Sequence, residues 1–289
     1  MALRLRKNHL AMSSAEKHRF VEAVLVLKRS GKYDRLVKEH RSAMPSMGGS
    51  MGGMPMGHMA HRNPWFLPWH RAFLERFEVE LRKVDSRATL PYWNWLEDRA
   101  KSSPLWHADF LGGTGQGAKE HVTDGAFAYD AGNWRIAVES DQVHDPALRR
   151  TIGRDERLPT KAAIRGALKR TPYDTAPWDD EARSPRSQVG TGFRPQLEHL
   201  VHDPVHMWVG GTMELATSPN DPVFFLHHAN VDRLWAVWRH EHPGETPYLP
   251  TQAGTRFDQD QSMPVFDTKP EAVLDHHALG YRYDVEDRP

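Results

Sequence analysis

The segment that most constrains this chain covers residues 221 to 239, with the sequence DPVFFLHHANVDRLWAVWR. Asp221 followed by Pro222 is typical of a helix start, because aspartate caps free backbone amides and proline needs no donor in the first turn. At helical spacing, the large aromatic side chains and His228 then share one face. A buried imidazole needs a partner. Asp232, one turn on, could be that partner in an ordinary core, or could orient the ring while a metal ion takes the other nitrogen.

Composition narrows the chemistry to histidine. The 289 residues include eighteen histidines but no cysteine, which excludes disulfides, thiolate zinc sites and cysteine nucleophiles. Lys plus Arg equals Asp plus Glu, at 38 each, so charge indicates neither a nucleic acid nor an anionic membrane as partner. No apolar run is long enough to span a bilayer, and the N-terminus lacks the apolar stretch of a signal peptide. We therefore expect a cytoplasmic protein, unless a partner exports it, with histidine-only metal chemistry.

Three histidines in the first third of the chain can approach one another. The helix predicted for YDRLVKEHR carries His40 on its apolar stripe. A further helix, expected to begin at residues 69 to 70 after Pro68, carries His70 on its apolar stripe. His61 lies in the loop ahead of this helix, where its ring can fold back toward His70. For each ring, the alternative is a histidine whose nitrogens are satisfied within the core.

Residues 42 to 60 interrupt the helical pattern. The stretch is dominated by Gly, Met, Ser and Pro and has no periodicity, so we expect a flexible loop inserted before His61. Its methionine thioethers, with His58, could collect Cu(I). The alternative is a solvated loop whose methionines are incidental.

A second group of histidines lies in GFRPQLEHLVHDPVHMWVGG. His202 and His206 are four residues apart, so a helix would put both rings on one face, together with His228 from its own helix. Pro204 between them predicts either a helix that begins there, with Asp203 as its cap, or a kinked helix.

Six inward-facing imidazoles without carboxylate or thiolate suit copper or zinc, with a position left open for another ligand. Burying them without a metal would be costly. If four helices pack as a bundle, two triads can face each other across it. We predict a mainly α fold, in which a four-helix bundle core holds two metal ions, with long loops and a few short strands, in a single domain of residues 1 to 289. The predicted ligands are His40, His61 and His70, then His202, His206 and His228.

Two motifs make a resemblance specific. HRNPWFLPWHRAFLERFE resembles the copper-A signature of tyrosinases, and DPVFFLHHANVD resembles their copper-B signature, both without a gap. Flanking motifs, among them LPYWNW, HMWVGG and SPNDPVF, resemble bacterial tyrosinases of the Streptomyces type, and the similarity extends to the LDHHALGYRYD tail. The resemblance to these type 3 copper proteins implies two copper ions as cofactors, copper A on the first triad and copper B on the second.

The resemblance also implies a function. It implies an enzyme that uses O2 to hydroxylate monophenols to catechols and to oxidise o-diphenols to o-quinones. The alternatives are a catechol or o-aminophenol oxidase with weak hydroxylation, and an oxygen carrier as in hemocyanins. A copper-delivering caddie protein is an implied partner. In the HH pair, the signature makes His228 the ligand and His227 its neighbour, and Glu198 resembles the family's glutamate that holds a water near copper B.

Asp203 departs from the family pattern. Efficient phenol hydroxylators usually have asparagine after the first copper-B histidine, where it helps to polarise the water. In this chain Asp203 could act directly as a base, hold water differently, or only cap a helix.

Residues outside the triads complete the expected site. Ala216 is small and would leave the mouth over copper B open to ring-bearing substrates, with Met207 also at the pocket. His276 and His277 lie in a stretch of little periodicity near the C-terminus. We expect them at the surface rather than as ligands.

Overall fold

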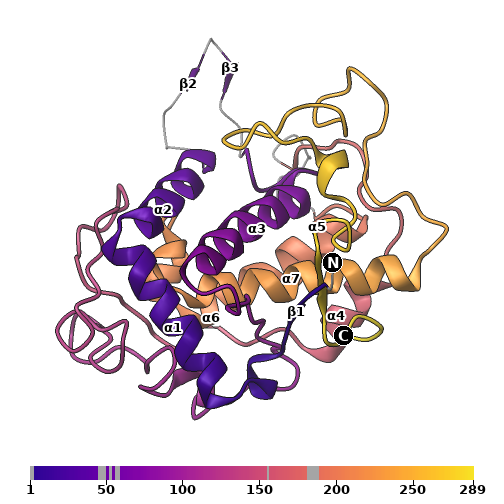
Figure 1. Cartoon of the computed structure of the whole chain (residues 1–289). Coiled ribbons are helices and arrows are strands. Elements are labelled where there is room, and N and C mark those ends of the chain that lie inside the picture. Colours follow the sequence, from indigo (N-terminus) through magenta and orange to yellow (C-terminus); the bar gives the residue numbers. More distant parts are fainter. Residues whose placement is uncertain (1–2, 45–49, 52–53, 56–58, 155, 181–188) are drawn as a thin grey trace.

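Helices α3 (Phe66–Val84) and α7 (Val223–Glu241) pack against each other at the centre of the molecule (Figure 1). Helix α1 (Ser14–Arg29) packs on α3, and α2 (Lys32–Ala43) follows α1 and packs against it. This arrangement comes from a computed structural model, which describes residues 3–44, 50–51, 54–55, 59–154, 156–180 and 189–289. The predicted mainly α fold with a helical core is confirmed.

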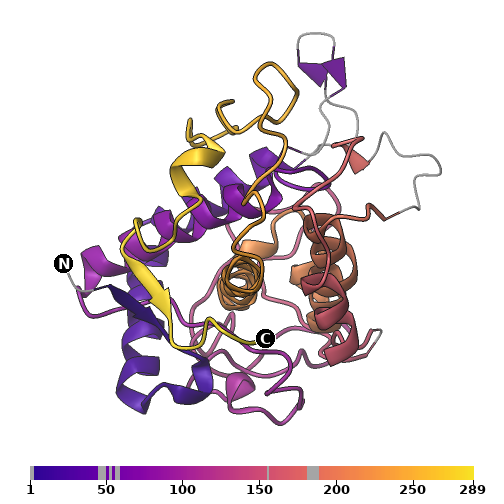
Figure 2. The same ribbon diagram turned by 90° about the vertical axis from the view of Figure 1, so that its right-hand side faces the viewer.

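A second group of short helices covers α7 from the other side (Figure 2). It consists of α4 (Lys161–Leu168), α5 (Phe193–Leu197), a π-helical turn η4 (Glu198–His202) and α6 (Asp203–Val209). In the described part of the chain, the loops contain the 3-10 turns η1 (His9–Ala11), η2 (Pro104–Trp106), η5 (Gly211–Glu214), η6 (Ser218–Asn220) and η7 (Pro270–Val273). None of the described helices is long and apolar enough to cross a membrane.

Short strands join the two ends of the chain. Strand β1 (Arg4–Arg6) pairs in parallel with β4 (Tyr281–Tyr283), so that Arg6 stands opposite Tyr283. A separate antiparallel pair, β2 (Ser50–Met51) and β3 (Met54–Pro55), belongs to the methionine-rich segment. Most of that segment, including His58, lies outside the described residues.

Local sequence signals explain most helix ends. Ser13 and Glu16 form the predicted capping box of α1. Gly31 separates α1 from α2 in the left-handed region, at φ 73°, where glycine has no steric penalty. The predicted start of α3 is wrong, because the helix begins at Phe66 rather than at residues 69 to 70. Pro68 lies inside the first turn, where a missing amide donor has no consequence.

Aromatic side chains fill the interface between the central helices. Phe77 of α3 stacks on Phe225 of α7, with ring centroids 3.6 Å apart, and Tyr33 of α2 packs edge-on against both. These rings are fully buried. Aromatic pairs contribute stabilisation beyond the apolar area that they bury, so this interface holds α2, α3 and α7 in fixed register.

A buried carboxylate connects the helices to the terminal strands. Asp232 of α7 accepts hydrogen bonds from Arg71 Nε of α3 at 2.6 Å, from the Tyr281 hydroxyl at 2.7 Å and from the Tyr283 hydroxyl at 2.6 Å. Arg6 of β1 adds a fourth contact at 3.5 Å. The chain therefore closes on itself around one charged group beneath the central helices.

Candidate metal centre

The first triad lies between α2 and α3. His40 comes from the last turn of α2, His61 from the loop ahead of α3, and His70 from the second turn of α3. All three are buried, and one nitrogen from each lies within 4.8 Å of the others. Nδ1 of His40 donates to the carbonyl oxygen of Ala216 at 2.9 Å, and Nδ1 of His70 donates to that of Phe66 at 2.7 Å. Their Nε2 atoms have no hydrogen-bond partner in the described part of the chain, as befits metal ligands.

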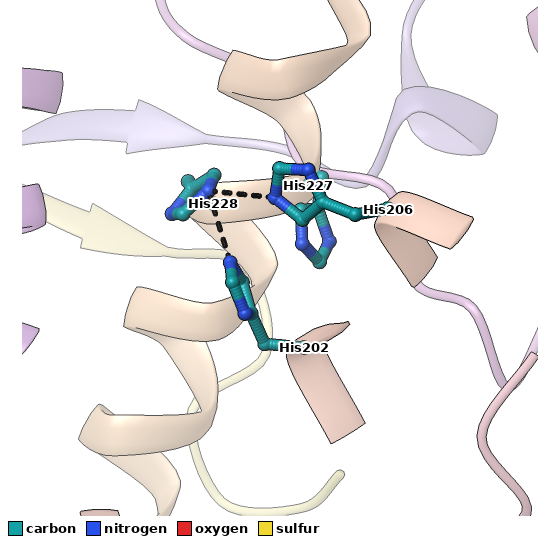
Figure 3. Close-up of side chains that lie close together, drawn as sticks. All are labelled: His202, His206, His227 and His228. Atoms are coloured by element: carbon teal, nitrogen blue, oxygen red, sulfur yellow. Dashed lines mark hydrogen bonds between the residues drawn. The ribbon is translucent and has the colours of Figure 1, made fainter. Parts of the chain in front are cut away.

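The second triad comes from η4, α6 and α7 (Figure 3). Nε2 of His228 lies 3.3 Å from Nε2 of His202 and 3.2 Å from Nε2 of His206. Nδ1 of His202 donates to Asp203 Oδ1 at 2.9 Å, and Nδ1 of His206 donates to the Met213 carbonyl at 2.7 Å.

These hydrogen bonds fix the tautomers of His202 and His206, so both rings turn a lone pair toward His228. One Nε2–H of His228 could satisfy only one of them, whereas a single cation satisfies all three nitrogens. Metal–nitrogen bonds of about 2.0 Å place the ligands of a tetrahedral ion about 3.3 Å apart. The observed spacing therefore fits a metal ion.

The two triads meet. The rings of His70 and His228 stack with centroids 4.3 Å apart, and those of His61 and His202 lie 5.9 Å apart. The structure thus brings all six predicted ligands to one buried position between α2, α3, α6 and α7.

Burial keeps five of these rings neutral: those of His40, His61, His70, His206 and His228. Desolvation lowers the pKa of His40 to about 4 and that of His206 to about 3. The same cause, with repulsion from neighbouring imidazoles, holds the pKa of His61, His70 and His228 well below the usual value. Neutral imidazole is the form that binds a metal ion, so at neutral pH no proton has to leave these rings first.

The turn η4 explains how a proline fits between two ligands. The backbone passes through η4 directly into α6, with Pro204 in the first turn of α6. The sequence offered a capped new helix or a kinked one, and the π-helical turn is a specific form of the kink. A π turn changes the hydrogen-bond register, so the amide that Pro204 lacks is not required. His202 and His206 still face the same side.

The comparison with family models decides the identity of this fold. The model described as the common central domain of tyrosinase matches residues 30–241. The chain belongs to the tyrosinase family. Similar relatives are the tyrosinases of Streptomyces glaucescens, 46% identical over 98% of this chain and 99% of the relative, and of Streptomyces antibioticus, 45% identical over 97% and 99%. The grixazone synthase of Streptomyces griseus is 40% identical over 97% and 99%.

Solved structures share the fold at lower identity. A polyphenol oxidase from Thermothelomyces thermophila superposes with a TM-score of 0.65, at 20% identity, over 97% of this chain and 88% of that one. A functional unit of octopus hemocyanin gives 0.64, at 20% identity, over 98% and 68%. The predicted class, a copper-dependent phenol oxidase with a dicopper centre, is confirmed by the family membership. The assignment of each histidine to copper A or copper B stays a prediction.

His227 lies closer to the second triad than its place in the sequence indicated. The ring is fully buried and neither nitrogen has a hydrogen-bond partner within the described ranges. It packs on Trp95 at 5.1 Å and on His202 at 5.0 Å, and its donor atom lies within 4.8 Å of those of the second triad. Periodicity could not reveal this, because adjacent residues on a helix diverge and only His228 falls on the aromatic stripe.

The prediction that Asp232 orients His228 is wrong. The Asp232 carboxylate is occupied by Arg71, Arg6, Tyr281 and Tyr283, and Nδ1 of His228 has no hydrogen-bond partner among the residues that the structure describes. Spacing of one helical turn allowed the contact, but two guanidinium groups attract the carboxylate more strongly than a neutral ring does.

Glu198 is fully buried at the start of η4, the turn that also carries His202. Its Oε1 accepts from the Arg62 backbone amide at 2.7 Å, and its Oε2 accepts from Arg194 Nη1 at 2.8 Å. Each oxygen retains a lone pair, so the family's role of holding a water remains open to it. That role stays a prediction.

Asp203 contacts the site through His202. Its Oδ1 accepts from His202, while its Oδ2 lies 3.4 Å from Arg62 Nη2 and 3.5 Å from His199 Nδ1. Burial raises the pKa of Asp203, but hydrogen bonds from His199 and His202 outweigh burial and hold the pKa well below its ordinary value. A carboxylate so stabilised is a weak proton acceptor.

A cleft of about 380 Å³ opens onto the triads. His40, His61, His202 and His206 form its floor, and its walls include Arg62, Asp203 and the two predicted pocket residues, Met207 and Ala216. Met207 is 44% exposed, which places it at the rim. The cleft gives a ring-sized molecule a path to the imidazoles.

Proposed function

We propose that this protein acts on small phenols, hydroxylating monophenols to catechols and oxidising o-diphenols to o-quinones with O2. The observation that carries the proposal is the meeting of two buried histidine triads at the floor of an open cleft. Two copper ions bound there would supply the redox chemistry that activates O2.

The residues of the chain position the ions and the substrate. Four imidazoles are held in one tautomer by oxygen acceptors, so their metal-facing nitrogens are oriented before any ion binds. Apolar groups at the mouth, Met207 and Ala216, leave room for an aromatic ring. The phenolic proton must pass to a base. Asp203 is poorly suited because of its lowered pKa, which favours a water held by Glu198.

A second candidate is a catechol or o-aminophenol oxidase with weak hydroxylation. Asp203 favours it, since efficient hydroxylators usually have asparagine there. A relative that aligns over 97% of this chain and 99% of its own length is named grixazone synthase rather than tyrosinase, so more than one named activity occurs among the relatives. An oxygen carrier is disfavoured by the open cleft.

Oxygen consumption separates these functions. The copper-loaded protein is supplied with tyrosine, catechol and o-aminophenol in turn, with the copper-free protein as control. We expect uptake with tyrosine as well as with catechol. Uptake with catechol and o-aminophenol but not tyrosine, at full copper content, would select the second candidate, and reversible O2 binding without turnover would select the carrier.

We also propose a copper-delivering caddie protein as partner, and a cytoplasmic location unless that partner exports the chain. Family membership supports the proposal of a caddie protein. The measurement is copper uptake by the apo-protein with free copper ions alone. Rapid and complete copper loading of the apo-protein without a partner would contradict the proposal of a caddie protein.

A further inference from the structure

A third group of metal-binding side chains lies away from the dicopper centre, beside the C-terminal strand β4. Nε2 of His276 lies 3.0 Å from Glu286 Oε1, and Nε2 of His277 lies 3.2 Å from Glu286 Oε2. One donor atom from each of the three side chains lies within 4.8 Å of the others. The side chains are 12%, 49% and 25% exposed, so the group is open to ions from solvent on one side only.

The carboxylate of this group is held in place. The Tyr283 backbone amide donates to Glu286 Oε1 at 2.5 Å. On either side of Glu286, the carbonyl oxygens of Val285 and Arg288 accept from Arg233 Nη1 of α7, at 3.3 and 2.8 Å. These hydrogen bonds fix the segment around Glu286 on a buried helix. Binding of an ion therefore costs little conformational entropy in this segment.

The two imidazoles are held as well. Asp275 Oδ1 accepts from the His277 backbone amide at 2.9 Å, and the Gly280 amide donates to the His277 carbonyl at 2.9 Å, which forms a turn ahead of β4. The two rings lie 4.2 Å apart between centroids, and the His276 ring packs on Tyr281 at 5.4 Å. Both rings therefore project from one rigid turn toward the same carboxylate.

We propose that His276, His277 and Glu286 bind one divalent transition-metal ion of the zinc or copper type, independently of the dicopper centre. Two imidazoles and a carboxylate are a common ligand set for such ions. Ligand atoms of a tetrahedral ion lie about 3.3 Å apart, close to the 3.0 and 3.2 Å seen here. Solvent supplies the remaining ligand on the exposed side.

The ion has a structural consequence. It ties the segment after β4 to the turn before it, and so holds Tyr281 and Tyr283 with their hydroxyls on Asp232. Asp232 in turn pairs with Arg71, the residue after His70. The proposed site therefore stabilises the support of the central helices without contacting the substrate cleft, and it does not rest on the proposed function.

Zinc titration of the copper-loaded protein tests the proposal. Calorimetry with Zn²⁺ is expected to show one ion bound per chain, with the copper content unchanged in the same sample. His277→Ala removes an exposed ligand without disturbing the core, and Glu286→Gln keeps an oxygen for the Tyr283 amide. Each should weaken zinc binding by more than the about 10–100-fold that loss of an outer-sphere partner costs. The matched control is His144→Ala, which removes an exposed histidine that pairs with Glu139 alone.

Hydrogen exchange gives a second readout that does not involve activity. Zn²⁺ should slow exchange of the backbone amides of residues 281 to 286 in the parent and in His144→Ala, but not in His277→Ala. Absence of zinc binding by the parent, or equal binding by His277→Ala and Glu286→Gln, would overturn the proposal and leave two histidine–carboxylate ion pairs without a metal. Zinc uptake accompanied by copper loss in all variants would also overturn it, because the ion would then occupy the dicopper centre.

Discussion

At the scale of single residues, the site is organised by the ring nitrogens that do not face the metal. His40, His70 and His206 each donate Nδ1–H to a backbone carbonyl, and His202 donates to Asp203. Each bond selects a tautomer and turns Nε2 inward. Three of these acceptors are peptide groups, which side-chain substitution cannot remove, so the Asp203 carboxylate is the acceptor most open to mutation.

Asp203→Asn tests the role of this carboxylate. The amide oxygen can still accept from His202, so copper content should be retained. The amide nitrogen adds a donor for a nearby water, which a carboxylate cannot supply. We expect the ratio of monophenol to diphenol oxidation to rise, measured by oxygen uptake on tyrosine and catechol. An unchanged ratio would show that the Asp203 carboxylate does not limit the hydroxylation of monophenols. The control Asp203→Ala, which removes the acceptor, should lose copper.

Ala216→Phe tests the entrance of the cleft. Its carbonyl is the acceptor for His40 and is unaffected by the side chain, so copper binding should persist. The added ring would fill part of the 380 Å³ cleft. The KM for phenols should therefore rise by a factor that corresponds to a free-energy difference on the order of 1–3 kcal/mol, which is what small changes in a pocket produce. Val79→Phe, at an exposed position on α3, is the matched control. Steady-state kinetics that are equal in both variants would exclude entry past Ala216.

At the scale of elements, apolar packing aligns the central helices α3 and α7, and the buried carboxylate of Asp232 connects them to the terminal strands. The sequence shows the apolar periodicity of α2, α3 and α7. From this periodicity, the inward direction of His40, His70 and His228 could be predicted. The environment of Asp232 was not, because its partners Arg6, Tyr281 and Tyr283 come from distant strands too short to show a pattern. The π turn η4 was hidden because it breaks the helical period on which the prediction depended. The ring of His227, which has no hydrogen-bond partner among the described residues, was hidden because it lies off the aromatic stripe of α7.

Asp232→Asn should destabilise the protein by about 3–5 kcal/mol, because it leaves the buried guanidinium group of Arg71 without its counter-charge, whereas Arg6 keeps its ion pair with Glu78 at 2.9 Å. Urea unfolding of the copper-free parent and variant at neutral pH measures this difference. Tyr283→Phe removes one donor to the same carboxylate and no charge, so its cost should be clearly smaller. Equal costs for the two variants would show that the charge pairing does not matter.

The pH dependence of that difference has a definite sign. Burial raises the pKa of Asp232, but the charges of Arg71 and Arg6 outweigh burial and depress it below the ordinary 3.8. A depressed carboxyl pKa contributes stability that is present above the ordinary value and is lost as the pH falls through the folded-state value. The stability gap between the parent and Asp232→Asn should therefore be constant near neutrality and narrow below pH 3.8. A gap that widens in acid would contradict this account.

At the scale of the whole molecule, metal binding and folding are coupled. The first triad lies near the N-terminal end and the second in the last third of the sequence, so the centre exists only when both parts are packed. The single domain of residues 1 to 289 stays a prediction. Nε2 of His40 and Nε2 of His70 have no hydrogen-bond partner among the described residues, and three Nε2 atoms of the second triad lie 3.2–3.3 Å apart, so the centre costs stability until metal ions bind.

Removal of copper should therefore lower the melting temperature. A ligand at 100 times its dissociation constant stabilises the folded state by about 2.7 kcal/mol, and tighter binding stabilises it further. Differential scanning calorimetry before and after chelation measures the effect. His121→Ala, which removes a histidine paired with Asp145 away from the centre, should show the same loss on chelation, whereas His206→Ala should show less. Identical melting with and without copper would exclude the coupling.

The parallel pairing of β1 with β4 has a consequence for biosynthesis. A ribosome makes β1 long before β4, because residues 7 to 280 lie between the two strands. Until then, Arg6 has no strand beside it, and Asp232 lacks its two tyrosine hydroxyls. The strand pair and the full set of hydrogen bonds to Asp232 can therefore form only after translation has passed residue 283.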